Sequence, residues 1–85
     1  MSQIEEIRAF VTVVETGSLT QAAERLGIAV SAVSRRLKDL ELRLGAPLIQ
    51  RSTRRMFLNE TGQRFFGRCR TILDELEAAL QEVQN

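Results

Sequence analysis

Apolar side chains recur at helical intervals near the start of the chain. The recurring positions are Ile4, Ile7, Val11 and Val14, with Phe10 beside them. Intervals of three and four residues place such positions on one face of an α-helix, and Gly17 is a typical C-terminal stop. We therefore predict a first helix over roughly residues 3–15.

A second, shorter helix is predicted to follow Ser18 and to end at Leu26. Ser18 and Gln21 have the spacing of a capping box, in which the serine oxygen accepts one free backbone N–H and the glutamine side chain bonds another. Ala22, Ala23 and Leu26 are expected to be buried. Ala23 matters because two closely crossing helices leave room for little more than a methyl group.

The helical pattern breaks at Gly27 and restarts near Ala29. Glycine adopts the left-handed conformation that ends a helix, and Ile28 with Val33 has the spacing of a hydrophobic staple at a helix start. The third helix is expected to bury Val33, Leu37, Leu40 and Leu44 and to expose Ser31, Ser34, Arg35 and Lys38. Such a joint lets the third helix project its N-terminal end outward, where side chains can enter a DNA major groove.

Two short helices joined by a turn with glycine are typical of a helix-turn-helix, although an ordinary helical hairpin has the same pattern. The charge distribution favours DNA, because residues 35–55 carry seven basic and two acidic side chains, a net charge of +5, while each flank carries −2. A concentrated positive charge is what a polyanion partner requires. The alternative is a solvated face balanced by helix pairs such as Arg35 with Asp39.

After Gly45 the pattern changes from helical to extended, and Pro47 opens the new segment. The predicted strands are LIQR (48–51) and MFL (56–58), with STRR (52–55) at the tip between them. Strands this short are not stable alone, so the hairpin must lean on the helices. Its basic side chains are Arg51, Arg54 and Arg55. They could reach a phosphate backbone or a minor groove, or they could simply keep an edge hairpin soluble.

A long last helix is predicted from the N-cap Asn59 to about Gln84. One apolar stripe at heptad spacing consists of Phe65, Cys69, Ile72, Leu76, Ala79 and Val83, and a second consists of Phe66, Leu73 and Leu80. This helix would be roughly 37 Å long, whereas the radius of gyration expected for the chain is about 12 Å. Its far end must protrude, which favours a homodimer through this helix. The alternative is a single amphipathic helix on its own core.

The composition excludes most enzymatic chemistry. The chain has no His, Tyr or Trp and only two aspartates, so it lacks the commonest general acid and the usual zinc ligands. It has no Gly-rich phosphate loop, and its single cysteine cannot form an internal disulfide. The longest apolar run is only a few residues. We expect no enzymatic activity, no metal, no cofactor and no membrane partner, in a cytoplasmic protein.

The run AAERLGIAVSAVSRRLKDLELRLGAPLIQRSTRRMFLNETG (22–62) resembles the N-terminal DNA-binding domain of LysR-type transcriptional regulators. The similarity extends over essentially all of the chain and includes the AVSR start of the third helix, the LG-x-PL turn and the R-x-x-R wing. It implies a mainly α, winged helix-turn-helix fold at 1–58, with a three-helix core and a two-stranded wing. It also implies a linker and dimerisation helix at 59–85, and regulation of bacterial promoters through double-stranded DNA.

The resemblance also assigns roles to single residues. The positions of the family that read bases fall on Val30, Ser31 and Ser34. Arg35 matches an arginine that contacts the groove or a phosphate, and Arg51 and Arg54 match the wing pair. Family members usually continue into a C-terminal region that binds a small-molecule effector, and that region is absent here.

Three positions depart from the family pattern, which often has serine, glutamine and proline where this chain has Ala29, Val30 and Ser31. Ala29 would cap the third helix poorly, a loss of about 0.5 to 2 kcal/mol against serine. Val30 cannot make the bidentate contact to adenine that glutamine makes, but it can contact a thymine methyl group. We expect a thymine preference at one position per half-site, unless Val30 packs back against the second helix.

These observations predict a dimeric domain that binds double-stranded DNA sequence-specifically. The alternative from another class is a protein-interaction module whose long helix is the functional part and whose basic patch is incidental. The salt dependence of binding to duplex DNA distinguishes them, because counterion release gives a steep slope only where phosphates are contacted.

Overall fold

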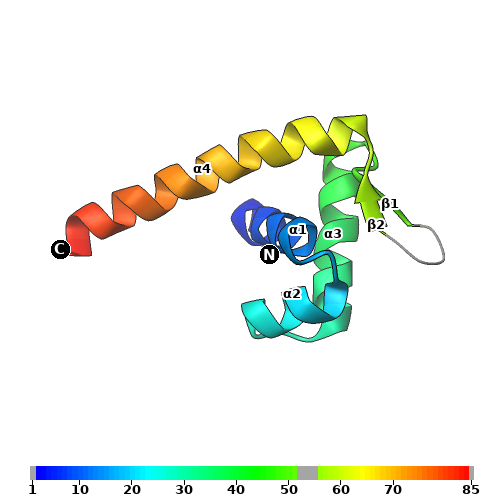
Figure 1. Cartoon of the computed structure of the whole chain (residues 1–85), viewed down its shortest axis with the longest axis horizontal. Coiled ribbons are helices and arrows are strands. Elements are labelled where there is room, and N and C mark those ends of the chain that lie inside the picture. Colours follow the sequence, from blue (N-terminus) through cyan, green and yellow to red (C-terminus); the bar gives the residue numbers. More distant parts are fainter. Residues whose placement is uncertain (1, 52–55, 85) are drawn as a thin grey trace.

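The computed structural model describes residues 2–51 and 56–84 (Figure 1). Its elements in chain order are α1 (Gln3–Thr16), α2 (Leu19–Leu26), α3 (Val30–Leu44), β1 (Ile49–Arg51), β2 (Met56–Leu58) and α4 (Glu60–Gln84). The predicted order of three helices, a hairpin and a long last helix is confirmed, and each boundary that the sequence predicted lies within about one residue of the observed one.

Side-chain caps define the starts of the first two helices. Ser2 Oγ accepts from the N–H of Glu5 at 3.2 Å, and Ser18 Oγ accepts from the N–H of Gln21 at 3.2 Å. The second half of the predicted capping box is replaced, because the N–H of Ser18 donates to Thr16 Oγ1 at 3.4 Å. The end of α1 and the start of α2 are therefore joined through Thr16 rather than through the glutamine side chain.

The turn between α2 and α3 follows the prediction. Gly27 is left-handed, with φ of 70°, a conformation that side chains with a Cβ adopt at a cost. Its N–H donates to Ala23 and Glu24 carbonyls, which closes α2. Ala29 is the N-cap of α3 and makes no side-chain hydrogen bond there. This agrees with the poor cap expected from alanine.

The core lies where α1 contacts the other three helices. Its buried apolar residues are Ala9, Phe10, Val11, Val13, Ala22, Ala23, Val33, Leu37, Leu40, Leu48, Cys69 and Leu73. The expectation that Leu44 is buried is wrong, because its side chain is 45% exposed. Leu44 is the last residue of α3, and the next core position is taken by Leu48 from the segment that follows.

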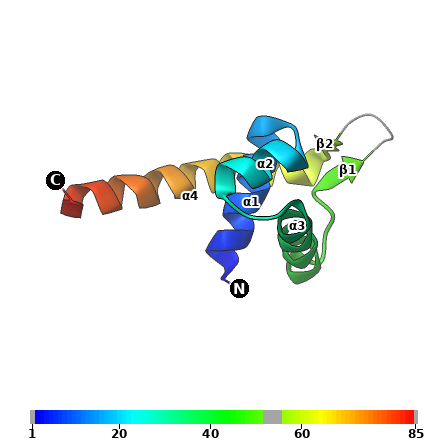
Figure 2. The same cartoon turned by 90° about the horizontal axis from the view of Figure 1, so that it is seen from below.

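The hairpin is antiparallel, with Ile49 opposite Leu58, Gln50 opposite Phe57 and Arg51 opposite Met56. As predicted, it leans on the helices, since Ile49, Met56 and Leu58 pack against the core while Phe57 on the other face is half exposed. Figure 2 shows it at the opposite end of the molecule from the C-terminus. The tip at 52–55 lies outside the described residues.

Helix α4 packs on the core with its first half only. Asn59 Oδ1 accepts from the N–H of Gly62 at 2.7 Å, which confirms the predicted N-cap. The ring of Phe10 lies 5.6 Å from Phe65 and 6.3 Å from Phe66, centroid to centroid. Beyond Leu73 the helix leaves the core, and Figure 1 shows its C-terminal half extending past the other helices. The molecule accordingly measures 45 × 26 × 21 Å.

None of the described helices is long and apolar enough to cross a membrane.

Candidate nucleic-acid interface

The start of α3 presents an exposed polar and basic face. Val30 is 42% exposed, Ser31, Arg35 and Lys38 are exposed, and Ser34 is half-buried. The left-handed Gly27 and the staple residue Ile28, which packs against the core, direct this end of α3 outward. The side chains predicted for the outer face of α3 are thus exposed, except for the half-buried Ser34, and Val30 is exposed as well. Their contact with DNA stays a prediction.

The arginines of α3 separate into two groups. Arg43 forms a bidentate pair with Glu6 of α1, with Nε to Oε1 at 3.1 Å and Nη2 to Oε2 at 2.9 Å. Arg36 Nη2 lies 3.9 Å from a carboxylate oxygen of Glu5. These two cations connect α3 to α1. Part of the positive charge counted along the sequence therefore stabilises the packing of α3 against α1.

Arg35 and Lys38 form the second group. Within residues 2–51 and 56–84 neither side chain has an ion-pair partner, and the pair of Arg35 with Asp39 considered above is not formed. Both side chains are exposed. Two cations without carboxylate partners on one helix face are available to phosphate oxygens.

Glu6 is a buried carboxylate that sequence reasoning missed, with only 1% of its surface exposed. The hydrogen bonds and charge of Arg43 lower the pKa of Glu6, against burial, which acts in the opposite direction. Because its folded pKa is depressed, its contribution to stability is present at neutral pH and is lost as the pH falls through that pKa. The sequence feature that indicates its burial is its position four residues before Phe10, which places it on the same face of α1.

The hairpin is fixed at its base by side chains from two helices. Glu41 Oε2 of α3 accepts from the N–H groups of Leu48 at 2.7 Å and Ile49 at 3.2 Å. Asn59 Nδ2 donates to the carbonyl of Pro47 at 2.8 Å. A hollow of about 400 Å³ lies between α3 and the hairpin, lined by Ser34, Leu37, Lys38, Glu41 and Ile49. Sequence reasoning assigned no role to Glu41.

The predicted basic residues of the hairpin are described only in part. Arg51 is the last residue of β1, opposite Met56. Arg54 and Arg55 lie outside the described residues.

The apolar stripe of α4 divides at Ile72. Phe65 is partly buried against the core and Cys69 is fully buried, and burial raises the pKa of the Cys69 thiol. Cys69 has no exposed surface that a partner chain could contact, so its predicted role in dimerisation is corrected, whereas the role of the partly buried Phe65 stays a prediction. They lie on the half of the helix that covers the chain's own core. The rest of the stripe is Ile72 at 56% exposed, the half-buried Leu76, the exposed Ala79 and Val83 at 87% exposed.

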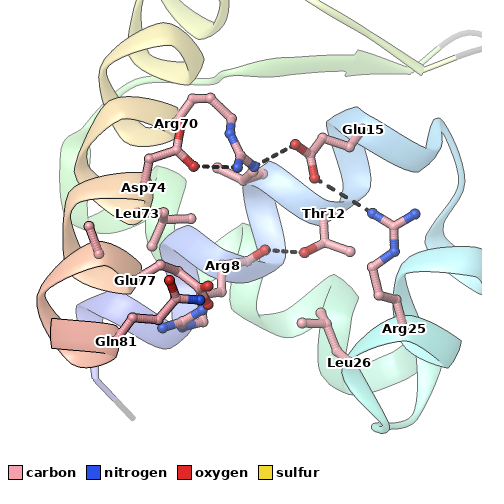
Figure 3. Close-up of a pocket in the computed structure, with 12 residues that line it drawn as sticks. Arg8, Thr12, Glu15, Arg25, Leu26, Arg70, Leu73, Asp74, Glu77 and Gln81 are labelled. Carbon is pink, nitrogen blue, oxygen red and sulfur yellow. Dashed lines mark hydrogen bonds and ion pairs between the residues drawn. The ribbon is translucent and has the colours of Figure 1, made fainter. Parts of the chain in front are cut away.

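A polar network holds α4 against α1 and α2. Figure 3 shows Glu15 of α1 between Arg70 of α4 and Arg25 of α2. Arg70 donates to Glu15 at 2.5 Å and to Asp74 at 2.6 Å, and Arg25 lies 3.6 Å from Glu15. An open groove of about 590 Å³ surrounds this network. The described residues contain no cluster of three or more His, Cys, Asp or Glu side chains that could hold a metal ion.

Comparison with known proteins places this geometry in a family. Residues 4–63 match the sequence model described as "Bacterial regulatory helix-turn-helix protein, lysR family". The HTH-type transcriptional regulator CrgA of Neisseria meningitidis serogroup C is 49% identical over 79 residues, which cover 93% of this chain and 26% of CrgA. The chain thus spans about a quarter of the length of the curated relatives it matches.

Two similar solved structures contain DNA. The BenM_DBD/benA site 1 DNA complex has a TM-score of 0.89 at 31% identity, covering 99% of this chain and 93% of that one. The CbnR_DBD-DNA complex has a TM-score of 0.86 at 28% identity, covering 99% of this chain and 95% of that one. The mainly helical fold with a two-stranded wing, expected from the sequence, is confirmed by these likenesses.

Proposed function

The chain belongs to the LysR family of bacterial regulatory helix-turn-helix proteins, and on that basis we propose that it binds double-stranded DNA sequence-specifically as part of a transcriptional regulator. Its relatives are regulators rather than enzymes. The observation that carries the proposal is the exposed face at the start of α3, where Arg35 and Lys38 have no ion-pair partner among the described residues.

In the proposed complex the N-terminal end of α3 lies in the major groove. Val30, Ser31 and Ser34 face base edges, and Arg35 and Lys38 reach phosphates beside them. The hairpin extends the contact to the backbone or the adjacent minor groove through Arg51, Arg54 and Arg55. A serine hydroxyl can donate a hydrogen bond to a base edge or accept one from it. These base contacts would determine which sequence is bound, because phosphate contacts carry no sequence information.

We propose that the partner protein is a second copy of this chain. The support is the overhanging half of α4, whose exposed apolar side chains Ile72, Leu80 and Val83 have no cover within the described residues. Two copies joined along this half would present two α3 helices to successive turns of one duplex. A small-molecule effector would act through a region outside this chain, in a regulator of the cytoplasm.

The competing function is a protein-interaction module in which α4 alone is functional. It shares the exposed stripe of α4, but it gives the unpaired Arg35 and Lys38 no role. The two functions therefore differ in what they predict for substitutions in α3.

The test is the affinity of Arg35→Ala for several unrelated duplexes. We expect Arg35→Ala to weaken binding on every duplex by about tenfold per bound subunit, because a charge-assisted hydrogen bond to a phosphate contributes on the order of 1.5 kcal/mol and carries no base information. Arg64→Ala is the matched control, since Arg64 is an exposed arginine on α4 and pairs with Glu60. Equal affinities for the two variants would contradict the proposed role of α3, and a loss confined to one base position would make Arg35 a base reader.

A further inference from the structure

The base of the hairpin is connected to α3 through one carboxylate. Glu41 Oε2 accepts both the N–H of Leu48 and the N–H of Ile49, at 2.7 and 3.2 Å. A carboxylate that accepts backbone N–H groups makes charge-assisted hydrogen bonds, which are stronger than neutral ones. Leu48 is 1% exposed, so without Glu41 its N–H would lose its partner away from water.

The same peptide is connected to α4 on its other side. The carbonyl of Leu48 accepts from the N–H of Asn59 at 3.1 Å, and it lies so close to Gly62 that a Cβ there would come within 2.2 Å of it. The strands of the hairpin are only three residues each, too short to hold an orientation by themselves. The direction of the hairpin relative to α3 therefore depends on these anchors and on its apolar contacts.

Glu41 and the predicted DNA-binding residues share one helix. Lys38 lies about one turn before Glu41 and Ser34 about two turns before it, and all three line the hollow between α3 and the hairpin. A negative charge in this position repels phosphates, so electrostatics alone would disfavour a carboxylate here. Its hydrogen bonds to the hairpin give it a different role.

We propose that Glu41 is a positioning residue for DNA binding, which sets the hairpin against α3 so that both reach the same duplex. The inference rests on the proposed function, since it requires that α3 and the hairpin both contact DNA. Glu41 itself does not touch the nucleic acid. It acts through the backbone of Leu48 and Ile49.

The test compares two substitutions with opposite properties. Glu41→Gln removes the charge but keeps an oxygen at the same reach, whereas Glu41→Asp keeps the charge but is one methylene too short. We expect Glu41→Gln to bind duplex DNA at least as tightly as the wild type. We expect Glu41→Asp to bind about tenfold more weakly, with a salt slope smaller in magnitude by about one or two, because the hairpin loses phosphate contacts. Asp39→Asn is the control for charge removal on the same helix.

A second measurement, amide hydrogen exchange in the protein without DNA, reports directly on the hydrogen bonds between Glu41 and the hairpin. The backbone amides of Leu48 and Ile49 should exchange faster with solvent in Glu41→Asp and at the wild-type rate in Glu41→Gln, while amides in the middle of α1 stay unchanged. Wild-type affinity and salt slope in Glu41→Asp would overturn the inference. So would weaker binding with an unchanged slope, because that loss would not come from the hairpin. A wild-type chain without salt-dependent DNA binding would instead overturn the proposed function.

Discussion

Val30 stands at the first position of α3 with 42% of its surface exposed. An exposed valine at the end of a helix gains little from packing, and its isopropyl group offers no donor or acceptor. In a major groove its one specific partner is the C5-methyl group of thymine. The sequence left open whether this side chain packs back on α2, and its exposure favours contact with a base.

We therefore predict a thymine preference at one position in each half-site. Replacing that thymine with deoxyuracil deletes only the methyl group and should reduce the binding free energy by about 1 kcal/mol, roughly the value of one buried CH₂. Competition binding with paired duplexes measures the difference. A Val30→Gln variant should shift the preference toward adenine without a lower melting temperature, and an unchanged preference would show that this position reads no base.

At the scale of elements, the junction between the hairpin and α4 depends on one glycine. A Cβ at Gly62 would lie 2.2 Å from the carbonyl oxygen of Leu48 and 3.0 Å from a methyl of Leu58. The first of these atoms belongs to the backbone and cannot rotate away. Gly67, one and a half turns further along α4, has open space around it.

The two glycines should respond to alanine in opposite ways. Gly62→Ala is expected to lower the free energy of unfolding by about 1 to 3 kcal/mol, since the hairpin must shift to admit the methyl group. Gly67→Ala is expected to raise it by up to about 1 kcal/mol, because alanine is the better helix former and nothing obstructs its Cβ. Urea unfolding of both variants is the measurement. Equal effects would mean that the hairpin base is not held against α4.

The elements themselves could be predicted because local signals define them. Ser18 and Gly27 lie at helix ends, and the caps they form involve neighbours in the chain. The contacts that were missed link residues far apart in sequence, as between Glu6 and Arg43, or a side chain and a backbone, as between Glu41 and Leu48. The number of arginines along the sequence does not tell which of them lie beside a carboxylate on another helix. The heptad pattern likewise included Cys69, and it does not tell that this side chain is buried in the core of its own chain rather than against a second chain.

At the scale of the whole molecule, α4 extends beyond the three-helix core and carries an apolar stripe to its end. Ile72 and Val83 are 56% and 87% exposed, and Leu80 beside them is 48% exposed. A monomer would leave this surface in water. The network around Arg70 and Glu15 holds the first half of α4 in place, so the direction of the overhang is set by the domain that carries α3.

We predict that Ile72→Glu sediments as a monomer under conditions in which the wild type is a dimer, because the introduced charge would be buried in the dimer interface along α4. Thr71→Glu is the matched control, since the preceding residue faces about 100° away around α4 and should leave the dimer intact. Operator affinity should fall far more in Ile72→Glu than in any variant that lacks one contact, as the second half-site is lost. A wild-type chain that is monomeric at micromolar concentration in ultracentrifugation would contradict the proposed dimer.

If the exposed face of α3 binds the phosphates and bases of duplex DNA, the affinity must depend steeply on salt concentration. Fluorescence anisotropy of a labelled duplex, measured between about 50 and 200 mM salt, gives the slope of log K against log salt concentration. Two subunits that each place Arg35 and Lys38 at phosphates predict a slope of about −3.5 or steeper, since each phosphate contributes about 0.9. Arg35→Ala in both subunits should make it shallower by about two. A slope near zero, or one that Arg35→Ala leaves unchanged, would contradict the proposed binding of DNA by α3.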